Sequence, residues 1–474
     1  MRRTALLAAA VTWITAFALA AVPASAATHT KSYTYPVSMK PYEVRQTLNF
    51  VDRPNVDGFI TGMSVNVVNA DGSAVPIQRL MLHHIVFFSI GQPNPTCSGA
   101  FTGYDSRPFP VGNYSTPIYG AGEERNVLVL PKGYGVPITK QTGADAWSKL
   151  QKQWAMVWML MNHRGVSDHA QIKYTVTWDD ATNLKPVKGY WLDVRNCDAD
   201  PVFDVRGGRK KGSTHRETFD YTMPDDGVIV AGGGHVHGGA KKLKVSEPDC
   251  SNRTVFQSKP AWGTREHPFY NVRPILHEPG PISMSGILSQ KGYPIARGER
   301  VRLTADYDAQ LPHTRVMGIS MIYVAHRDVA KCGKPPGDIQ HIQPAELQGL
   351  PYRKHTPRFT VPLTGLDKNG NAHEIEQPAG ARVARADGAT IGVGSHFFGP
   401  PNVAVQRGSA LNWKFNSTGY EGLHNVTLAS GPRGFSSPNL NDGREFKFRF
   451  KVPGKYKLFC ALHPVQMQQT VLVK

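Results

Sequence analysis

The chain consists largely of short stretches in which apolar and polar residues alternate, the pattern of strands with one buried face. Residues 445–452 alternate strictly, a Pro-Gly pair at 453–454 turns the chain, and residues 456–460 alternate again. Long runs rich in Ala, Leu, Glu and Lys, which favour helices, are absent from the sequence. The 46 Gly and 36 Pro residues indicate frequent turns. This pattern predicts an all-β protein.

The first 26 residues have a different pattern. Arg2 and Arg3 precede an Ala-rich apolar run, and a small-x-small sequence ends at Ala26. A charged start, an apolar middle and such an ending are typical of a secretory signal peptide, which we assign to residues 1–26. The apolar run is nearly long enough to cross a bilayer, so an uncleaved anchor is the alternative. We therefore predict a secreted, periplasmic or otherwise extracytoplasmic protein.

The formal net charge of +18 is spread along the chain, without an arginine-rich tract or a basic helix. Such a distribution favours adhesion to anionic cell-wall polymers over binding of nucleic acid.

Five cysteines occur, at Cys97, Cys197, Cys250, Cys332 and Cys460. Disulfides are the default state of cysteines in an exported protein, and an odd number leaves one thiol that needs another role. Cys460 supplies that role, because His463 and Met467 follow it closely.

A copper centre is predicted near the C-terminus. Cys460, His463 and Met467 form a Cys-x-x-His-x-x-x-Met loop after a buried strand, and an earlier strand supplies His424. One thiolate, two imidazoles and a weak thioether are the ligands of a type 1, or blue, copper site. Any one of these residues alone would more often be packing, but the four types in this order point to the metal.

With these ligands, residues 386–474 resemble plastocyanin, amicyanin and related cupredoxins. Phe398, Pro400, Gly408, Trp413 and Asn416 fall where those proteins carry their first-strand pattern. The resemblance implies a Greek-key β-sandwich and one-electron transfer with an external electron donor.

Three apolar, strand-like stretches of the first 330 residues carry histidines. They are residues 79–88 with His83 and His84, residues 158–163 ending at His163, and residues 228–239 with His235 and His237.

The spacing of these histidines constrains how they could share a metal. His235 and His237 are two residues apart, so on a strand their side chains point to the same side. His83 and His84 are adjacent and would face opposite ways, unless the strand bulges there. Taken singly, each stretch is as consistent with structural histidines as with ligands.

Together, the order of these histidines resembles the ascorbate-dependent type II copper monooxygenases, such as peptidylglycine α-hydroxylating and dopamine β-monooxygenases. The resemblance implies two further copper ions. One, an electron relay, would be held by His83, His84 and His163. The other, where oxygen is activated, would be held by the predicted catalytic residues His235, His237 and Met317. Met317 begins an apolar strand and is preferred to Met284, with Met321 in reserve.

Two departures from this family are clear. The peptide-processing enzymes have an arginine two residues before the first His of His-x-His, where this chain has Gly233. The tyrosine expected four residues after the Met is Met321. Amidation of glycine-extended peptides is therefore not expected. The layout also resembles stress-up-regulated nodulin-type proteins, for which no reaction can be carried over.

In this resemblance, the spacing of the histidine-bearing stretches implies two jelly-roll-like β-sandwich domains, at residues 28–193 and 194–334. Residues 335–385 form a linker with a hairpin at 367–370, and the cupredoxin domain at 386–474 follows. Within these domains Cys97 would pair with Cys197 and Cys250 with Cys332, although four cysteines allow three pairings.

Three functions follow from these patterns. The first is an exported multicopper oxidoreductase, in which the blue-copper domain transfers electrons to a monooxygenase-like module that acts on molecular oxygen and an unidentified substrate. The alternative is a non-catalytic copper-binding or electron-transfer protein, with the N-terminal domains as a scaffold or docking module. A zinc hydrolase at His235 and His237 ranks last, because no carboxylate base lies beside the pair in the sequence.

Overall fold

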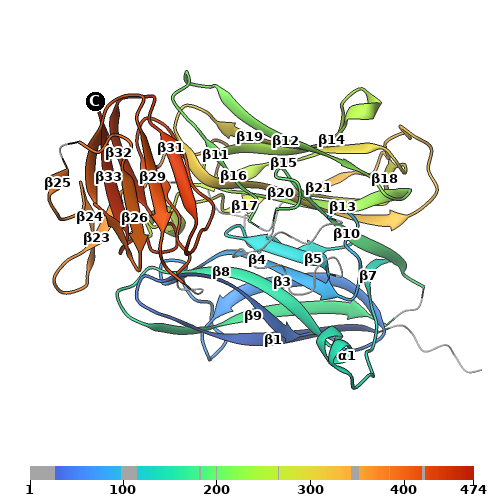
Figure 1. The fold of residues 1–474 in the computed structure, drawn as a ribbon. Coiled ribbons are helices and arrows are strands. Elements are labelled where there is room, and N and C mark those ends of the chain that lie inside the picture. The colour runs from blue at the N-terminus through green and yellow to red at the C-terminus, as the bar shows by residue number, and fades with distance from the viewer. Residues whose placement is uncertain are drawn as a thin grey trace, which may run out of the picture.

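The computed structural model describes residues 27–97, 115–180, 183–198, 200–264, 266–342, 352–383, 385–418 and 422–474. The predicted signal peptide lies outside these residues. Strands dominate the described chain, which confirms the all-β prediction (Figure 1). Among the described residues no helix is long and apolar enough to cross a membrane.

The first domain is a sandwich of two antiparallel layers, blue to teal in Figure 1. One layer has the order β1-β9-β3-β7 and the other β2-β8-β4-β5, with a short helix beside them. Alternate residues of β9, from Ala170 to Val176, are buried between the layers. The elements are β1 (Thr28–Met39), β2 (Val44–Asp52), β3 (Gly58–Val68), β4 (Leu80–Ile90), β5 (Ser115–Gly122), β6 (Leu128–Val129), β7 (Tyr134–Ile138), α1 (Ala146–Gln151), β8 (Gln153–Asn162) and β9 (Asp168–Asp179).

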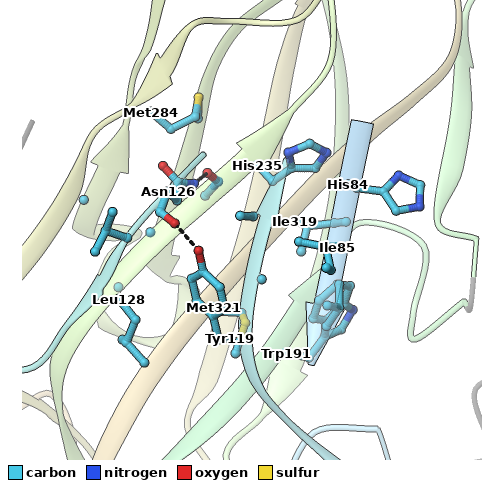
Figure 2. Close-up of a pocket in the computed structure, with 18 of the residues that line it drawn as sticks. His84, Ile85, Tyr119, Asn126, Leu128, Trp191, His235, Met284, Ile319 and Met321 are labelled. Carbon is cyan, nitrogen blue, oxygen red and sulfur yellow. Dashed lines mark hydrogen bonds between the residues drawn. The ribbon is translucent and has the colours of Figure 1, made fainter. Parts of the chain in front are cut away.

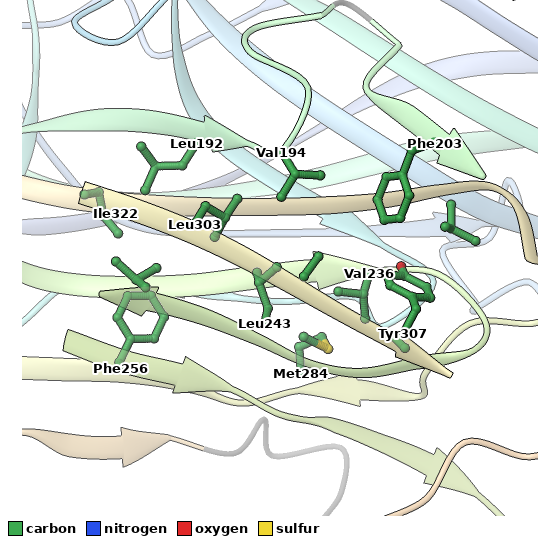
Figure 3. Packing of buried hydrophobic residues seen from close by; sticks show 14 of the residues in the cluster. Leu192, Val194, Phe203, Val236, Leu243, Phe256, Met284, Leu303, Tyr307 and Ile322 are labelled. Carbon is green, nitrogen blue, oxygen red and sulfur yellow. The ribbon is translucent and has the colours of Figure 1, made fainter. Parts of the chain in front are cut away.

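The second domain packs a layer containing β10, β20, β13 and β18 against a layer ordered β12-β19-β14-β15. Its core lies where Leu192 and Ile322 of one layer face Leu243 and Leu303 of the other (Figure 3). The elements are β10 (Lys185–Asp193), β11 (Val202–Val205), β12 (Thr214–Thr222), β13 (Gly227–Val236), β14 (Ala240–Glu247), η2 (Pro248–Cys250), β15 (Arg253–Ser258), β16 (Pro260–Gly263), η3 (Pro268–Asn271), β17 (Ser283–Met284), β18 (Gly286–Ile295), β19 (Arg300–Asp308), β20 (His313–His326), β21 (Gln340–Ile342) and β22 (Tyr352–Arg353).

One sheet runs through both domains. β7 of the first domain pairs in parallel with β10, and β10 pairs with β20 of the second domain. β10 lies at the end of the predicted first domain, and its hydrogen bonds connect a sheet of the first domain to a sheet of the second. The domains therefore share backbone pairing as well as side-chain contacts.

The C-terminal domain, orange to red in Figure 1, is a sandwich of two sheets ordered β25-β28-β33-β32-β30 and β27-β26-β29-β31. Trp413, Phe415, Phe450 and Tyr456 are fully buried between them, as the alternating pattern predicts. The strands are β25 (Arg382–Val383), β26 (Thr390–Gly394), β27 (Phe397–Gly399), β28 (Asn402–Val405), β29 (Ala410–Phe415), β30 (Thr427–Ser430), β31 (Glu445–Arg449), β32 (Gly454–Phe459) and β33 (Gln468–Val473).

The described part of the predicted linker packs against the domains that it joins. β22 pairs with β16, and Phe359 stacks on Tyr270 with ring centroids 5.4 Å apart. The hairpin expected at residues 367–370 is present, between β23 (Leu363–Leu366) and β24 (Ala372–Ile375). The backbone N–H of Ala372 donates to the hydroxyl of Tyr42 in the first domain, 3.0 Å away.

The C-terminal domain is fixed to the second domain by polar contacts. The Asp204 carboxylate of β11 accepts hydrogen bonds from the Ser436 backbone N–H at 2.6 Å and from its hydroxyl at 2.8 Å. Arg315 of β20 donates to the Ser437 carbonyl at 3.0 Å. Val465 is buried in a hydrophobic cluster that also contains residues of the first and second domains. The C-terminal domain is therefore docked in a defined orientation.

Both predicted disulfides are confirmed: Cys97 bonds to Cys197 and Cys250 to Cys332. Cys460 is buried and free of a disulfide, as its proposed role requires.

A buried carboxylate links β9 to the start of β4 and gives a test of the fold. Arg79 donates two hydrogen bonds to Asp168, at 2.8 and 2.6 Å, and Arg164 donates a third at 2.5 Å. Burial would raise the pKa of Asp168, but the bonds from Arg79 and Arg164 outweigh it and lower the pKa. A lowered carboxyl pKa stabilises the fold above the unfolded-state value near ~3.9, and this stabilisation is lost as the pH falls below it.

We expect Asp168→Asn to lower the free energy of unfolding by about 3 kcal/mol at pH 7, because two guanidinium groups lose their counterion. The difference from the unsubstituted protein should shrink as the pH falls from about 4 toward 3. Guanidinium denaturation at pH 7 and at acidic pH measures both effects. Asp71→Asn, which changes an exposed carboxylate in a turn, is the matched control and should have little effect. Equal destabilisation at both pH values would contradict the assigned role.

Candidate metal centres

The first candidate centre lies at one end of the C-terminal sandwich. His424 precedes β30, and the loop from Cys460 to Met467 joins β32 to β33. Tight backbone bonds shape this loop: Cys460 N–H donates to the Met467 carbonyl at 3.1 Å, and Met467 N–H to the His463 carbonyl at 3.0 Å. The backbone therefore fixes the spacing of all three loop residues.

The ligand atoms of this centre converge. The Nδ1 atoms of His424 and His463 are 3.1 Å apart, and Cys460 Sγ is 3.6 Å from His463 Nδ1. The three ligand atoms lie within 4.8 Å of one another. Met467 is fully buried in the same core cluster as Cys460. The structure thus brings together the two imidazoles and the thiol of the predicted set, with Met467 in the adjoining core.

Asn425 organises the surroundings of Cys460. Its backbone N–H points at Cys460 Sγ, 3.4 Å away, and its side-chain carbonyl accepts from Ala461 N–H at 2.8 Å. A hydrogen bond to sulfur tunes a thiolate–metal bond, and a second bond to the loop limits its movement. Sequence reasoning did not assign this residue a role, although it directly follows His424.

The two imidazoles of this centre are in the form that binds metals. Burial, with a smaller contribution from His396, lowers the pKa of His424 to about 4. Burial, then His424 and His396, lowers the pKa of His463 to about 3. Both rings are therefore neutral near pH 7 and can offer a lone pair. Sequence reasoning also missed His396, whose exposed ring lies 4.5 Å from that of His463.

The second candidate centre is a group of histidines between the first two domains, called here the histidine cluster. It comprises His83, His84, His163, His235, His237 and His277.

A bulge in β4 resolves the problem of the adjacent histidines. The pairing of β4 with β8 shifts register between Leu82 and His84, which leaves His83 as the extra residue. The ring centroids of His83 and His84 lie 5.4 Å apart. The condition set by the sequence for a shared metal, a bulge at this point, is therefore met.

The structure brings the two predicted ligand sets together. The ring of His83 lies 4.7 Å from that of His237 and also 4.7 Å from that of His277. His235 and His237 point to the same side of β13, as their spacing predicts, with ring centroids 5.1 Å apart. Strands of both domains thus supply one group of imidazoles.

Two buried carboxylates hold the rings. Glu123 Oε1 lies 2.5 Å from both His83 Nδ1 and His277 Nε2, and Glu123 Oε2 accepts from Gly280 N–H at 2.7 Å. Glu124 lies 3.1 Å from His235 Nδ1. A carboxylate on one ring nitrogen orients a histidine whose other nitrogen binds a metal.

Backbone carbonyls hold two further rings in the same way. The Arg315 carbonyl accepts from His237 Nδ1 at 3.0 Å, and the Pro274 carbonyl accepts from His163 Nδ1 at 3.0 Å.

The remaining ring nitrogens are the main sign of a ligand. Several are buried and have no hydrogen-bond partner among the described residues. They are His84 Nδ1, His163 Nε2, His235 Nε2, His237 Nε2 and His277 Nδ1. Buried polar atoms without a partner are rare in folded proteins and call for an explanation such as a bound ion. A metal ion would provide that explanation.

Electrostatics keeps most of these rings neutral. Burial is the main cause that lowers the pKa of His83, and it holds the pKa values of His84 and His237 well below the usual range. Burial also lowers the pKa of His163 to about 4. For Glu123, burial opposes ionisation, but the charge and hydrogen bond of His277 outweigh it and hold its pKa well below the usual value.

Met317 lies next to the His235/His237 pair. His235 pairs with Ile319 in the β13–β20 register, and Met317, two residues from Ile319, faces the same way. The Tyr307 hydroxyl accepts from His237 N–H at 2.9 Å and donates to the Met317 carbonyl at 2.6 Å, which ties the two backbones together. Met317 lines a cavity with His84 and His235, and Met321 and Met284 line it too.

Sequence reasoning missed His277, Glu123 and Glu124. The sequence did contain a signal for the two carboxylates, since an acidic pair follows directly after an apolar, glycine-containing stretch. Both side chains are buried, which is rare for charged residues unless they have a partner. His277 lies in a loop without strand alternation, so no periodic pattern pointed to it.

The C-terminal domain faces the histidine cluster. Phe459, Ala461 and Leu462, which flank Cys460, line a small cavity of about 80 Å³ whose other walls include His83, His84 and His237. Residues that flank Cys460 and residues of the histidine cluster therefore border the same cavity.

Comparison with known proteins gives a narrow result. No protein-family model and no curated protein matches the chain. The solved structures that match include amicyanin variants and another cupredoxin. An oxidised amicyanin mutant is 19% identical, covering 18% of this chain and 80% of that chain, with a TM-score of 0.16. A purple cupredoxin from Nitrosopumilus maritimus is 26% identical, covering 18% of this chain and 99% of that chain, with a TM-score of 0.17. The interpretation of the sites therefore rests on their ligand geometry.

Proposed function

We propose that the protein is an exported, copper-dependent oxidoreductase. The observation that carries this proposal is the placement of a Cys460/His424/His463 ligand group directly against a buried histidine cluster whose free nitrogens point to bound metal. The electron donor is an external reductant that meets the C-terminal domain. The net positive charge of the whole protein would favour retention on anionic cell-wall polymers. We do not propose nucleic acid as a partner.

The residues of the C-terminal centre suit one type 1 copper. A thiolate, two neutral imidazoles and a buried thioether on a rigid sandwich are the donor set of such sites. Asn425 holds the thiolate and the loop in place. The function of this domain would be one-electron transfer.

The histidine cluster suits two further coppers. His83, His84 and His163 remain the candidates for one, now with His277 beside them, and His235, His237 and Met317 for the other. Imidazoles and a thioether favour copper over hard cations. Copper bound there would supply one-electron chemistry and a coordination position for molecular oxygen. Glu123 and Glu124 would orient the rings, and the surrounding apolar walls would exclude water.

Hydrogen bonds form a route between the two centres. Asn425 N–H contacts Cys460 Sγ, and the next residue, Val426, donates its N–H to the Ser437 hydroxyl at 2.9 Å. The Ser437 carbonyl accepts from Arg315, whose own carbonyl accepts from His237 at 3.0 Å. The C-terminal domain could thus deliver electrons to the cluster without leaving its docked position. Oxidation of a C–H bond with oxygen is the reaction class that this arrangement favours.

Metal analysis with electron paramagnetic resonance tests the proposal. The purified full-length protein should hold three coppers, one with the small hyperfine splitting of a type 1 site and two without it. One blue copper alone would instead support a simple electron-transfer protein with a scaffold. Zinc in the cluster would contradict the proposed oxidoreductase function, because zinc(II) does not change its oxidation state.

A further inference from the structure

A cavity of about 440 Å³ lies between the first two domains, beside the histidine cluster. This is roughly three times the engineered cavity of ~150 Å³ that binds benzene, and it falls within the range of small-molecule sites. His84 and His235 lie together at one side of it, as Figure 2 shows.

The lining of this cavity is largely apolar. No Asp, Glu, Lys or Arg side chain is among the described residues that line it. Aliphatic, aromatic and thioether groups form the walls, the last two kinds including Phe88, Tyr119, Trp191, Met321 and Tyr323. Such walls favour a ligand that is itself apolar, because a charged ligand would lose its hydration without gaining a counterion.

The polar groups in the walls are mostly satisfied within the protein. The Tyr119 hydroxyl donates to the Asn126 carbonyl at 2.5 Å, and the Tyr323 hydroxyl donates to the Ile118 carbonyl at 3.0 Å. Trp191 donates to Asp193 at 2.9 Å. One buried nitrogen of each imidazole, His84 Nδ1 and His235 Nε2, has no hydrogen-bond partner among the described residues. The cavity therefore has apolar walls and one side at which two imidazole nitrogens are available to a metal or ligand.

Gly233 leaves room on the floor of the cavity. It lies two residues before His235 on β13, so both face the same side. A Cβ added at Gly233 would meet nothing within 4 Å, whereas one at Gly232 or Gly234 would meet the packed side chains of Phe256 or Leu243. The open space above Gly233 is therefore part of the cavity.

The entrance to the cavity is apolar too. Val127 and Val129, which line it, are 46% and 53% exposed and are among the most exposed large hydrophobic residues described.

We propose that this cavity binds a neutral, hydrophobic small molecule, with its reactive end toward His84 and His235. That this molecule is the substrate rests on the function proposed above; the binding itself does not. The apolar walls disfavour a charged ligand, and Gly233 sets the depth available to the ligand.

Fluorescence titration of the full-length protein tests the proposal with two probes that differ by one charge. N-phenyl-1-naphthylamine is neutral, and 8-anilinonaphthalene-1-sulfonate carries a sulfonate on the same ring system. The neutral probe should saturate one site per chain and bind at least tenfold more tightly than the anionic probe. Gly233→Leu, which fills the cavity, should weaken the neutral probe at least tenfold. Gly337→Leu is the matched control, because a Cβ there also meets nothing, and it should leave binding unchanged.

Val129→Lys at the exposed entrance provides a second test that does not depend on packing. It should weaken the neutral probe several-fold and improve binding of the anionic probe. Absence of saturable binding of the neutral probe, or equal binding in the Gly233→Leu variant with its fold intact by circular dichroism, would overturn the proposal. Copper content is measured on the same samples. A protein that holds copper but does not bind the probe would contradict the cavity proposal alone, and one that binds the probe but holds no copper in the cluster would contradict the proposed copper function alone.

Discussion

The Cys460→Ser variant is expected to lose the intense visible absorption of a blue-copper centre completely while keeping its fold. That colour arises from the thiolate–copper bond, and Cys460 is the one cysteine outside the two disulfides. A serine hydroxyl fills the space but supplies no sulfur, and burying it should cost about 1–2 kcal/mol. Visible absorption of the copper-loaded protein, with thiol titration after denaturation, measures the change.

Met467→Leu is the matched control for this substitution. It alters a fully buried residue of the same loop at nearly constant volume, so stability should change by less than about 1.5 kcal/mol. The thioether is a weak ligand, and the colour should therefore persist with an altered reduction potential. Colour retained in Cys460→Ser would refute the assignment of the thiolate.

The same serine variant tests the relay. With the entry point removed, electrons from an external donor should reach the coppers of the histidine cluster much more slowly. Stopped-flow reduction followed by electron paramagnetic resonance records this step separately from turnover. Unchanged reduction kinetics would show that the cluster does not depend on the C-terminal domain.

The Glu123→Ala variant is expected to lose copper from the histidine cluster. The carboxylate holds His83 and His277 at 2.5 Å each, and its removal frees both rings to rotate. Loss of such an orienting group typically costs ~10–100-fold in metal affinity. We therefore expect about two coppers per chain to remain when free copper is kept low by a competing chelator: the blue one and the one proposed at His235, His237 and Met317, whose His235 ring is held by Glu124.

Glu247→Gln is the control for losing a buried carboxylate. Glu247 is fully buried and bonded to Arg253 and Tyr293, away from the cluster, so its replacement should lower stability without changing copper content. Equal copper loss in both variants would mean that Glu123 acts through general stability. Glu123→Gln should fall between, because an amide keeps a hydrogen bond but not the charge.

The C-terminal ligands could be predicted because they are close in sequence. Cys460, His463 and Met467 lie within one loop, and strict alternation marks the strand before it. A local pattern of this kind specifies both the residue types and their spacing, so only His424 had to come from elsewhere. The disulfide pairing could be predicted from the division into domains, because the two cysteines of each pair lie within one predicted domain or at its edge.

The histidine cluster could be predicted only in part, because its geometry depends on the contact between two domains. The sequence shows that His235 and His237 share a face, and it shows that His83 needs a bulge. It does not show that His83 lies nearer to His237 and His277 than to His84. Glu123 was missed because its partners are 40 and 154 residues away along the chain.

The continuous sheet has a mechanical consequence. Lys185 N–H donates to the Gly133 carbonyl at 2.8 Å, and the Tyr323 side-chain hydroxyl donates to the Ile118 carbonyl at 3.0 Å, so hydrogen bonds join the two domains at two places. A hinge motion that parted the domains would have to break these bonds. The two sandwiches should therefore move as one stiff body, and the strands that carry His83 and His237 should keep their relative positions.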